Sequence, residues 1–387
     1  MSTPPPAPPR MRTPWWSWAV PVAAAAALVL GLLVGAGGWM TLLCLPALIG
    51  AVLVSVHHAE LIAHRLGEPL GTLVLAIAIT VIEVALIVSA MVGGDPEKAS
   101  LPRDTIFATI MIICNGVMGL CLLVGSLAHR EQTFRVDGIH AAFAALITLT
   151  TLSLVLPSFT TSSHGATFTP AQLGFSAIAS LSLWAVFIFG QTIRHREYFL
   201  PPTAPLGDVE SDTAIGTSAL GTATATDAHD GAPHPTAGQA WASLGLLLLS
   251  LIAVVGLAKQ LSPAIESGLH ALHAPKGVLG IAIALLVLLP ETVAAIRAAR
   301  ANRLQTSFNL ALGSALASIG LTIPAVVLAS VLFDLPLVLG LDGKSVVMLA
   351  VTFLVGTVTL ASGRTNVIQA GVHLVLFAAF LFLSIVP

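Results

Sequence analysis

Residues 70–92 read LGTLVLAIAITVIEVALIVSAMV, an apolar run with one charged residue, Glu83, near its middle. A run of about 20 apolar residues is long enough to cross a bilayer as a helix. A carboxylate deep in a membrane span costs free energy and usually marks a functional position. A second run, residues 277–296, reads GVLGIAIALLVLLPETVAAI and also carries one charge, Glu291. Two such carboxylates, one in each half of the chain, predict a paired site.

The composition indicates an all-α polytopic membrane protein. Of the 387 residues, 56% are hydrophobic and only 9% are charged, whereas soluble domains carry roughly a quarter charged residues. The apolar runs are long and do not alternate with polar residues, which argues against a membrane β-barrel. The net charge of −2 gives no indication of nucleic-acid binding. The three cysteines lie in apolar runs without the spacing of a metal site, so we expect them to be packing residues.

Eleven runs have the length of a membrane span. We read the first as a retained helix and not as a signal peptide, because no small-residue cleavage site ends a short apolar core. The expected helices cover about 15–35, 39–64, 70–92, 104–128, 137–157, 170–193, 239–260, 277–298, 304–332, 344–361 and 366–386.

The basic residues predict the orientation of these spans, because cytoplasmic loops carry an excess of Lys and Arg. With the N-terminus in the cytoplasm, eleven of the 16 Lys and Arg residues fall inside. These are Arg10, Arg12, Arg65, Arg130, Arg135, Arg194, Arg196, Arg297, Arg300, Arg303 and Arg364. An odd number of spans then puts the C-terminus outside, and we expect the protein in a bacterial inner membrane.

One long hydrophilic segment divides the chain into two halves. It is acidic, contains His229 and His234, and cannot form an apolar core, so we read it as a cytoplasmic linker. Each half then has five helices, and the second half must enter the membrane from the opposite side, as in many secondary transporters. The predicted parts are a disordered N-terminus (1–14), an extra helix (15–35), a first inverted repeat (39–194), the linker (195–238) and a second repeat (239–387).

Polar residues recur in the helix that follows each glutamate. The first half has Asn115 within TIMIICNGVMGL, and the second has Ser314 and Ser318 within NLALGSALASIGLTIP. Aligning the two stretches pairs Asn115 with Ser318. Each residue alone could serve helix packing, but the repeated arrangement favours neighbours of the two glutamates.

Two further oxygen atoms lie next to the glutamates in the sequence. Thr80 precedes Glu83 by three residues and so shares its helix face. Its hydroxyl could ligate an ion or bond back to its own helix. Pro290 precedes Glu291 and removes the backbone bond to the carbonyl of Leu286, which predicts a kink and a free carbonyl oxygen.

These residues together predict an all-oxygen site for hard cations. Carboxylates, amides, hydroxyls and carbonyls suit calcium, sodium or magnesium and do not suit a soft metal. Two buried carboxylates would bind protons when the cation is absent. Competition of protons and a cation for the same carboxylates is the minimum requirement of an antiporter. No bound cofactor is needed, and the absence of a nucleotide-binding loop argues against a pump.

The two glutamate regions also resemble a known family. HHAELIAHRLGEPLGTLVLAIAITVIEVALIVS (57–89) and LLPETVAAIRAARANRLQTSFNLALGSALASIGLTIP (288–324) look like the two repeats of the calcium/cation antiporter superfamily, closest to bacterial ChaA-type calcium/proton antiporters. The resemblance implies ten core helices, alternating access, and export of Ca²⁺ in exchange for H⁺, with Na⁺ or K⁺ exchange as the alternative. It also implies that Glu83 and Glu291 hold the transported ion.

A polar cluster in the second helix permits a rival interpretation. His57, Glu60 and His64 can share a helix face, and Glu68 follows. They could hold a metal ion in an intramembrane hydrolase. Because they lie at the cytoplasmic end of the helix, an interfacial cluster or a proton path for the exchanger is the preferred interpretation.

Overall fold

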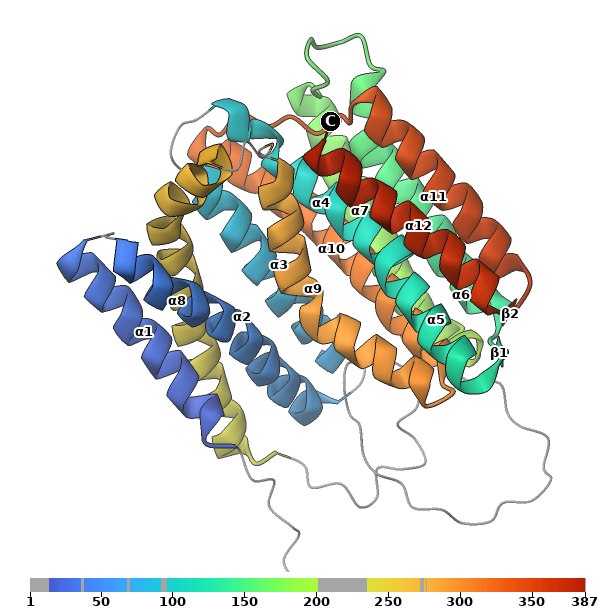
Figure 1. The fold of residues 1–387 in the computed structure, drawn as a ribbon, viewed down its shortest axis with the longest axis horizontal. Coiled ribbons are helices and arrows are strands. Elements are labelled where there is room, and N and C mark those ends of the chain that lie inside the picture. Colours follow the sequence, from blue (N-terminus) through green and yellow to red (C-terminus); the bar gives the residue numbers. More distant parts are fainter. Residues whose placement is uncertain are drawn as a thin grey trace, which may run out of the picture. The chain divides into compact units, whose positions relative to one another are not determined.

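The computed structural model describes residues 14–35, 38–67, 70–91, 96–200, 235–271, 275 and 277–386 (Figure 1). The predicted N-terminal tail and most of the predicted linker therefore lie outside the described residues. The α-helices are α1 (Trp16–Val34), α2 (Gly38–Leu66), α3 (Leu70–Met91), α4 (Leu101–Met111), α5 (Met118–His129), α6 (Val136–Thr150), α7 (Pro170–Phe189), α8 (Ala237–Ala271), α9 (Gly277–Arg300), α10 (Leu304–Phe333), α11 (Gly343–Ala361) and α12 (Val367–Ile385).

Several of these helices contain or adjoin turns of other helix types. The π-helical turns are η2 (Ile112–Val117), η3 (Thr151–Val155) and η5 (Gly190–Arg194), and the 3₁₀ turns are η1 (Pro96–Ser100), η4 (Leu156–Ser158) and η6 (Arg196–Phe199). A short antiparallel strand pair, β1 (Gln132–Thr133) and β2 (Arg364–Thr365), joins the loop after α5 to the loop after α11.

The expectation of eleven membrane spans is confirmed within the described residues. Eleven helices there are long and apolar enough to cross a membrane. The span Lys98–His129 combines α4, η2 and α5 into one continuous helix. In the most apolar stretch of this span, 89% of the residues are buried. The protein is thus an all-helical, multi-pass membrane protein.

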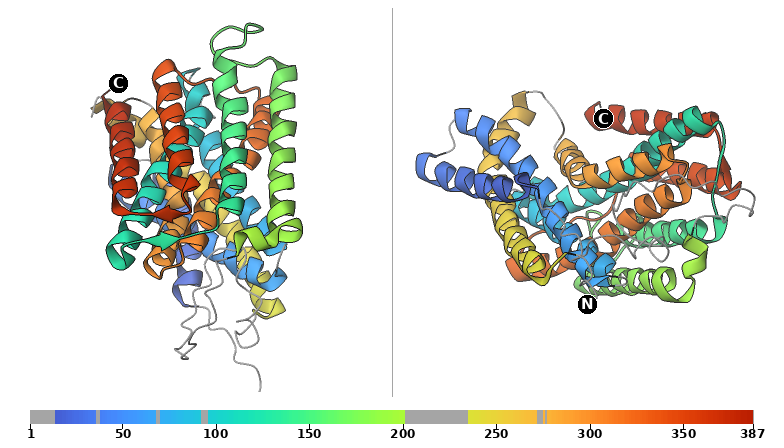
Figure 2. Two further views of the ribbon diagram at one scale, coloured as in Figure 1. Left: turned by 90° about the vertical axis from the view of Figure 1, so that its right-hand side faces the viewer. Right: turned by 90° about the horizontal axis from the view of Figure 1, so that it is seen from below.

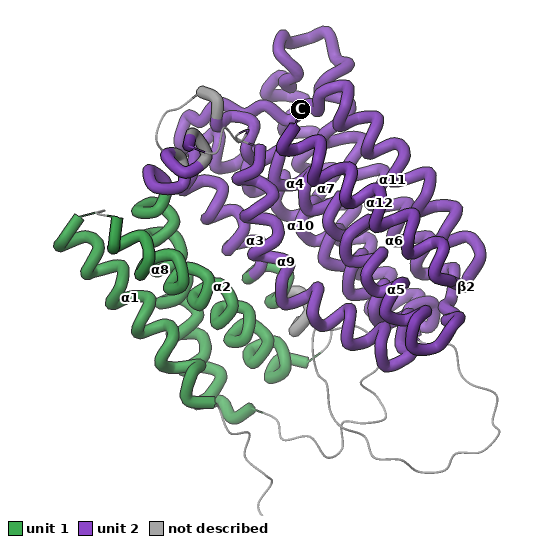
Figure 3. Tube along the Cα trace, viewed as in Figure 1, with its two compact units in different colours: residues 1–78, 224–261 green, residues 79–223, 262–387 purple. Residues whose placement is uncertain are grey.

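The chain separates into two compact units, Met1–Ala78 with Thr224–Leu261, and Ile79–Ala223 with Ser262–Pro387 (Figure 3). The second unit combines helices from both predicted repeats. The repeat boundaries therefore stay a prediction.

In the first unit, α1 packs against α2, and its buried residues form a stripe of small side chains. The buried residues of α1 are Ser17, Pro21, Ala24, Ala27 and Gly31, three or four positions apart. Small residues on one face allow two helix backbones to approach closely in a membrane. Gln260 of α8 donates from Nε2 to the carbonyl of Leu28 at 3.0 Å, which attaches α8 to α1.

In the second unit, α10 is the central helix. It contacts α6, α7 and α9, while α4 packs against α9 and α5 packs against α12. Figure 2 shows α6, α7, α11 and α12 running side by side. The buried cluster of apolar residues extends over all of these helices.

Gly320 permits the close approach of α10 and α7. A Cβ atom at this position would lie 2.6 Å from Cβ of Trp184. We therefore expect Gly320→Ala to lower stability by about 1–3 kcal/mol through overpacking. Gly174→Ala in α7 is the matched control, because nothing lies within 4 Å of the added atom. Thermal unfolding in detergent checks this, and equal melting temperatures of the two variants would contradict the packing argument.

Candidate functional site

The buried carboxylate of Glu83 is held by two hydroxyl groups of α10. Ser318 Oγ lies 2.9 Å from Oε1 and 2.8 Å from Oε2, and Thr322 Oγ1 donates to Oε2 at 3.0 Å. Glu83, Ser318 and Thr322 are 2%, 7% and 0% exposed. The structure thus brings together two of the residues singled out from the sequence, Glu83 and Ser318, and joins helices from the two halves of the chain.

The hydroxyls face Glu83 because they repeat with helical spacing on α10. Ser314, Ser318 and Thr322 are four residues apart and so lie along one helix face. Ser314 is half-buried one turn before Ser318. Thr322 was not among the site residues predicted from the sequence, although it continues the four-residue spacing of the hydroxyls.

Glu291 is equally buried, at 4% exposure, on α9. This helix packs against α10 and against the span that contains Asn115. Pro290 lies inside α9, as expected. Because proline has no backbone N–H, the Leu286 carbonyl lacks the hydrogen-bond donor that a helix normally supplies four residues further along the chain. Figure 1 shows that α9 changes direction midway along its length.

Asn115 lies in the π-helical turn η2 and is fully buried. Its Nδ2 donates to Thr352 Oγ1 of α11 at 2.9 Å. Its Oδ1 accepts no hydrogen bond within the part of the chain that the structure describes. A buried acceptor without a partner is costly, and π-turns are frequent at functional sites. The amide therefore presents an oxygen atom suited to a ligand.

In each half of the chain, the helix that follows the glutamate lies against the glutamate helix of the other half. The helix that follows Glu83 contains Asn115 and packs against α9, which carries Glu291. The helix that follows Glu291 is α10, whose hydroxyls bond Glu83. Each glutamate helix thus meets the polar helix of the other half. Thr80, one turn before Glu83, is buried as well, at 6% exposure.

The cluster on α2 does not form a metal site. His57 lies against the ring of Trp16, with ring centroids 4.7 Å apart, while His58 Nε2 is 2.9 Å from the carbonyl of Ser17. Among the described residues, no group of three or more His, Cys, Asp and Glu side chains could hold a metal ion. The metal centre that the hydrolase interpretation of His57, Glu60 and His64 requires is therefore not found among the described residues.

The proton path through the same cluster stays a prediction. His57, Glu60 and His64 belong to the first unit and Glu83 to the second. Glu68 lies outside the described residues.

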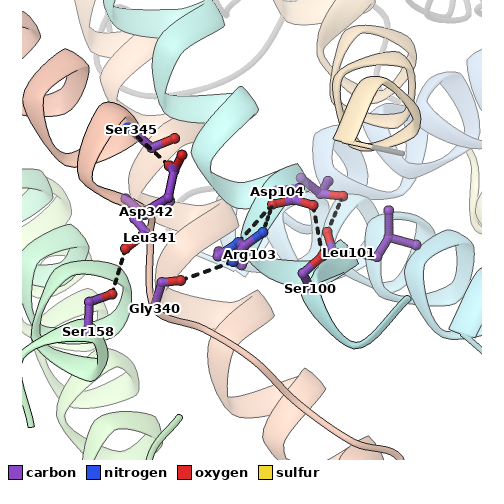
Figure 4. Close-up of polar contacts among 10 residues, drawn as sticks. Ser100, Leu101, Arg103, Asp104, Ser158, Gly340, Leu341, Asp342 and Ser345 are labelled. Atoms are coloured by element: carbon purple, nitrogen blue, oxygen red, sulfur yellow. Dashed lines mark hydrogen bonds and ion pairs between the residues drawn. The ribbon is translucent and has the colours of Figure 1, made fainter. Parts of the chain in front are cut away.

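A second polar cluster lies where α4 and α11 begin (Figure 4). Arg103 forms an ion pair with Asp104 at 2.7 Å and donates to the Gly340 carbonyl at 3.1 Å. Asp342 accepts a bond from the Ser345 amide at 3.1 Å and so caps α11. The ends of α4, α9, α11 and α12 line an adjoining cavity of about 290 Å³.

The charges in this cluster largely balance. Burial by itself raises the pKa of Asp342, but hydrogen bonds from Ser345 and the positive charges of Lys344 and Arg103 outweigh it, so this pKa lies below its usual value. Asp104 is paired with Arg103 in the same way. The cluster ties α4 to the loop before α11, and nothing in its charge favours a cation over an anion.

The fold and the buried carboxylates define a multi-pass membrane protein of the ion-exchanger class. The sequence matches the sodium/calcium exchanger protein family over residues 36–193 and 242–386, and the chain belongs to this family. Its members are exchangers, so the chain is a transporter of the antiporter type. The resemblance to the calcium/cation antiporter superfamily is thereby confirmed.

Two relatives and one solved structure define the similarity further. An ionic transporter of Sinorhizobium fredii, y4hA, is 44% identical over 97% of both chains. The sodium-potassium/proton antiporter ChaA of Escherichia coli is 32% identical, covering 88% of this chain and 87% of its own. The structure of native YfkE superposes with a TM-score of 0.69 at 16% identity, covering 96% of this chain and all 100% of YfkE, and so shows the same fold.

The orientation of Asn115 gives a prediction. Thr352→Val removes the acceptor of Nδ2, so the amide can turn, and we expect the KM for the exchanged cation to rise several-fold. Thr352→Ser keeps the hydroxyl and should behave as the parent. Cation-dependent proton movement in everted vesicles measures the effect.

Thr357→Val is the control for this prediction. It lies in the same helix, and its hydroxyl bonds only the Phe353 carbonyl of that helix in the described contacts. If Thr352→Val and Thr357→Val gave the same KM, Thr352 would have no part in orienting Asn115.

Proposed function

We propose that the chain exchanges a cation for protons, and that Glu83 and Glu291 bind both in turn. The environment of Glu83 carries this proposal. Its carboxylate is buried, and within the described residues no basic side chain forms an ion pair with it. A buried charge without a counter-charge is unfavourable, so the site needs either a cation or a proton. Exchange of one for the other follows directly.

The residues that we propose as ligands around the glutamates offer oxygen atoms. The proposed set contains the carboxylates of Glu83 and Glu291, the hydroxyls of Thr80, Ser314 and Ser318, the amide oxygen of Asn115, and the Leu286 carbonyl. Hard cations prefer such ligands. A site of this kind binds inorganic cations and protons and requires no resident cofactor.

Ca²⁺ is the first candidate for the cation. Two carboxylates neutralise one divalent ion, and calcium takes six to eight oxygen ligands, more than the two glutamates alone supply. Na⁺ or K⁺ exchange is the second candidate, because the relative ChaA, 32% identical, is named a sodium-potassium/proton antiporter. Proton release from everted vesicles, compared for the three ions, distinguishes them.

The transport cycle that we propose is alternating access between two inverted halves. The crossed arrangement supports it, because each glutamate helix packs against the polar helix of the other half. A movement of one half relative to the other would then change which side the carboxylates face. The His57, Glu60, His64 and Glu68 cluster is a candidate proton path on the cytoplasmic side.

The central prediction concerns the charge of the two glutamates. Glu83→Gln and Glu291→Gln keep size and hydrogen bonding but remove a titratable group. Each should lower exchange a hundredfold or more, because losing one charged partner in a buried site costs roughly 3–5 kcal/mol. Replacement by Asp should do less harm. In the parent, protons should inhibit cation binding competitively, with about two protons released per calcium ion.

Glu131→Gln is the matched control for this experiment. Glu131 is an exposed carboxylate 3.7 Å from Arg364 on the strand pair, and a surface ion pair contributes little. It should exchange at the parental rate. Parental rate and pH dependence in Glu83→Gln would show that the paired-carboxylate mechanism is wrong.

The orientation in the membrane is tested separately. We propose an inner-membrane protein with a cytoplasmic N-terminus, a cytoplasmic linker and an external C-terminus. The three native cysteines, Cys44, Cys114 and Cys121, are buried and are replaced first. Single cysteines at Ser218 and after Pro387 should then react with an impermeant thiol reagent from opposite sides. Reaction from the same side would contradict the inverted halves.

A further inference from the structure

Thr322 differs from several other threonines in the spans by the direction of its hydroxyl. In the described contacts, the hydroxyls of Thr105, Thr150 and Thr292 each donate to the carbonyl four residues earlier in their own helix, at 2.7–2.8 Å. This is the common arrangement of a helical threonine. Thr322 instead donates across to Glu83 of α3. Its hydroxyl therefore serves the carboxylate and not its own helix.

The number of available protons shows why two hydroxyls are needed. Ser318 lies within bonding distance of both carboxylate oxygens but has one proton to donate. Thr322 reaches only Oε2. The assignment that gives each oxygen a donor is Ser318 to Oε1 and Thr322 to Oε2. Without Thr322, one buried oxygen of Glu83 would share or lose its donor, which is costly for a charged group.

A hydroxyl also suits a carboxylate that alternates between two states. It donates to the charged carboxylate and can turn to accept from the protonated carboxyl, which an ammonium or guanidinium group cannot do. The two hydroxyls can therefore hold Glu83 in one place whether or not it carries a proton.

We propose that Thr322 is a positioning residue, which with Ser318 holds the Glu83 carboxylate in one orientation against α10. The proposal rests on the proposed role of Glu83 and adds a residue to that site.

The test compares Thr322→Val with Thr322→Ser. Valine has nearly the same shape and lacks the hydroxyl, so the carboxylate loses a donor and is no longer held in one orientation toward the cation. We expect the KM for the cation to rise roughly tenfold at neutral pH, with little change in kcat, since a bond to a charged group has about that effect. Thr322→Ser keeps the hydroxyl and should restore the parental KM.

Thr150→Val is the matched control, since Thr150 is fully buried and its hydroxyl bonds the Leu146 carbonyl of its own helix. It should keep the parental KM. Thermal unfolding in detergent is measured for every variant. If Thr322→Val does not fold, Thr322→Ala removes the same hydroxyl with less bulk and is tested in its place.

The outcomes separate this inference from the proposed function. A parental KM in Thr322→Val, together with an inactive Glu83→Gln, would overturn the role of Thr322 and leave the glutamate mechanism standing. Parental behaviour in both would overturn both. An equal loss in Thr322→Val and Thr322→Ser would show that Thr322 acts through packing and not through its hydroxyl.

Discussion

A carboxylate buried inside a membrane protein is the constraint on which this structure depends. Glu83 is 2% exposed, and its described neighbours are the hydroxyls of Ser318 and Thr322. Two neutral donors satisfy the oxygens of a carboxylate but do not cancel its charge. We therefore propose that a proton or a cation balances this charge, and membership of an exchanger family agrees with that proposal.

The same constraint accounts for the crossed arrangement of the second unit. The donors for Glu83 come from α10, more than 230 residues further along the chain, and not from its own half. In the other half, the π-turn that carries Asn115 packs against the helix of Glu291. Because the donors for Glu83 come from the other half, this contact joins the two halves of the chain, as the proposed alternating access requires.

The sequence is informative here because the physics of a bilayer is simple. The length of the apolar runs predicted all eleven spans, because a backbone in lipid must bond its own polar groups and a single apolar run can do so only as a helix. The isolated charges Glu83 and Glu291 stood out against apolar runs, and the repeat comparison paired Ser318 with the site before any contact was known. The interpretation of His57, Glu60 and His64 as a metal centre was wrong for the described residues, because a shared helix face does not place three ligands around one point.

The sequence by itself determined the class of the protein, the number of its spans and the two carboxylates, because each of these depends on local hydrophobicity and charge. The tertiary structure alone decided which groups hold Glu83, that Thr322 turns away from its own helix, and that Asn115 lies in a π-turn with its amide fixed by Thr352. These features depend on contacts between helices far apart in the chain. A hydroxyl's partner is chosen by its geometry in the folded protein and not by its neighbours in sequence.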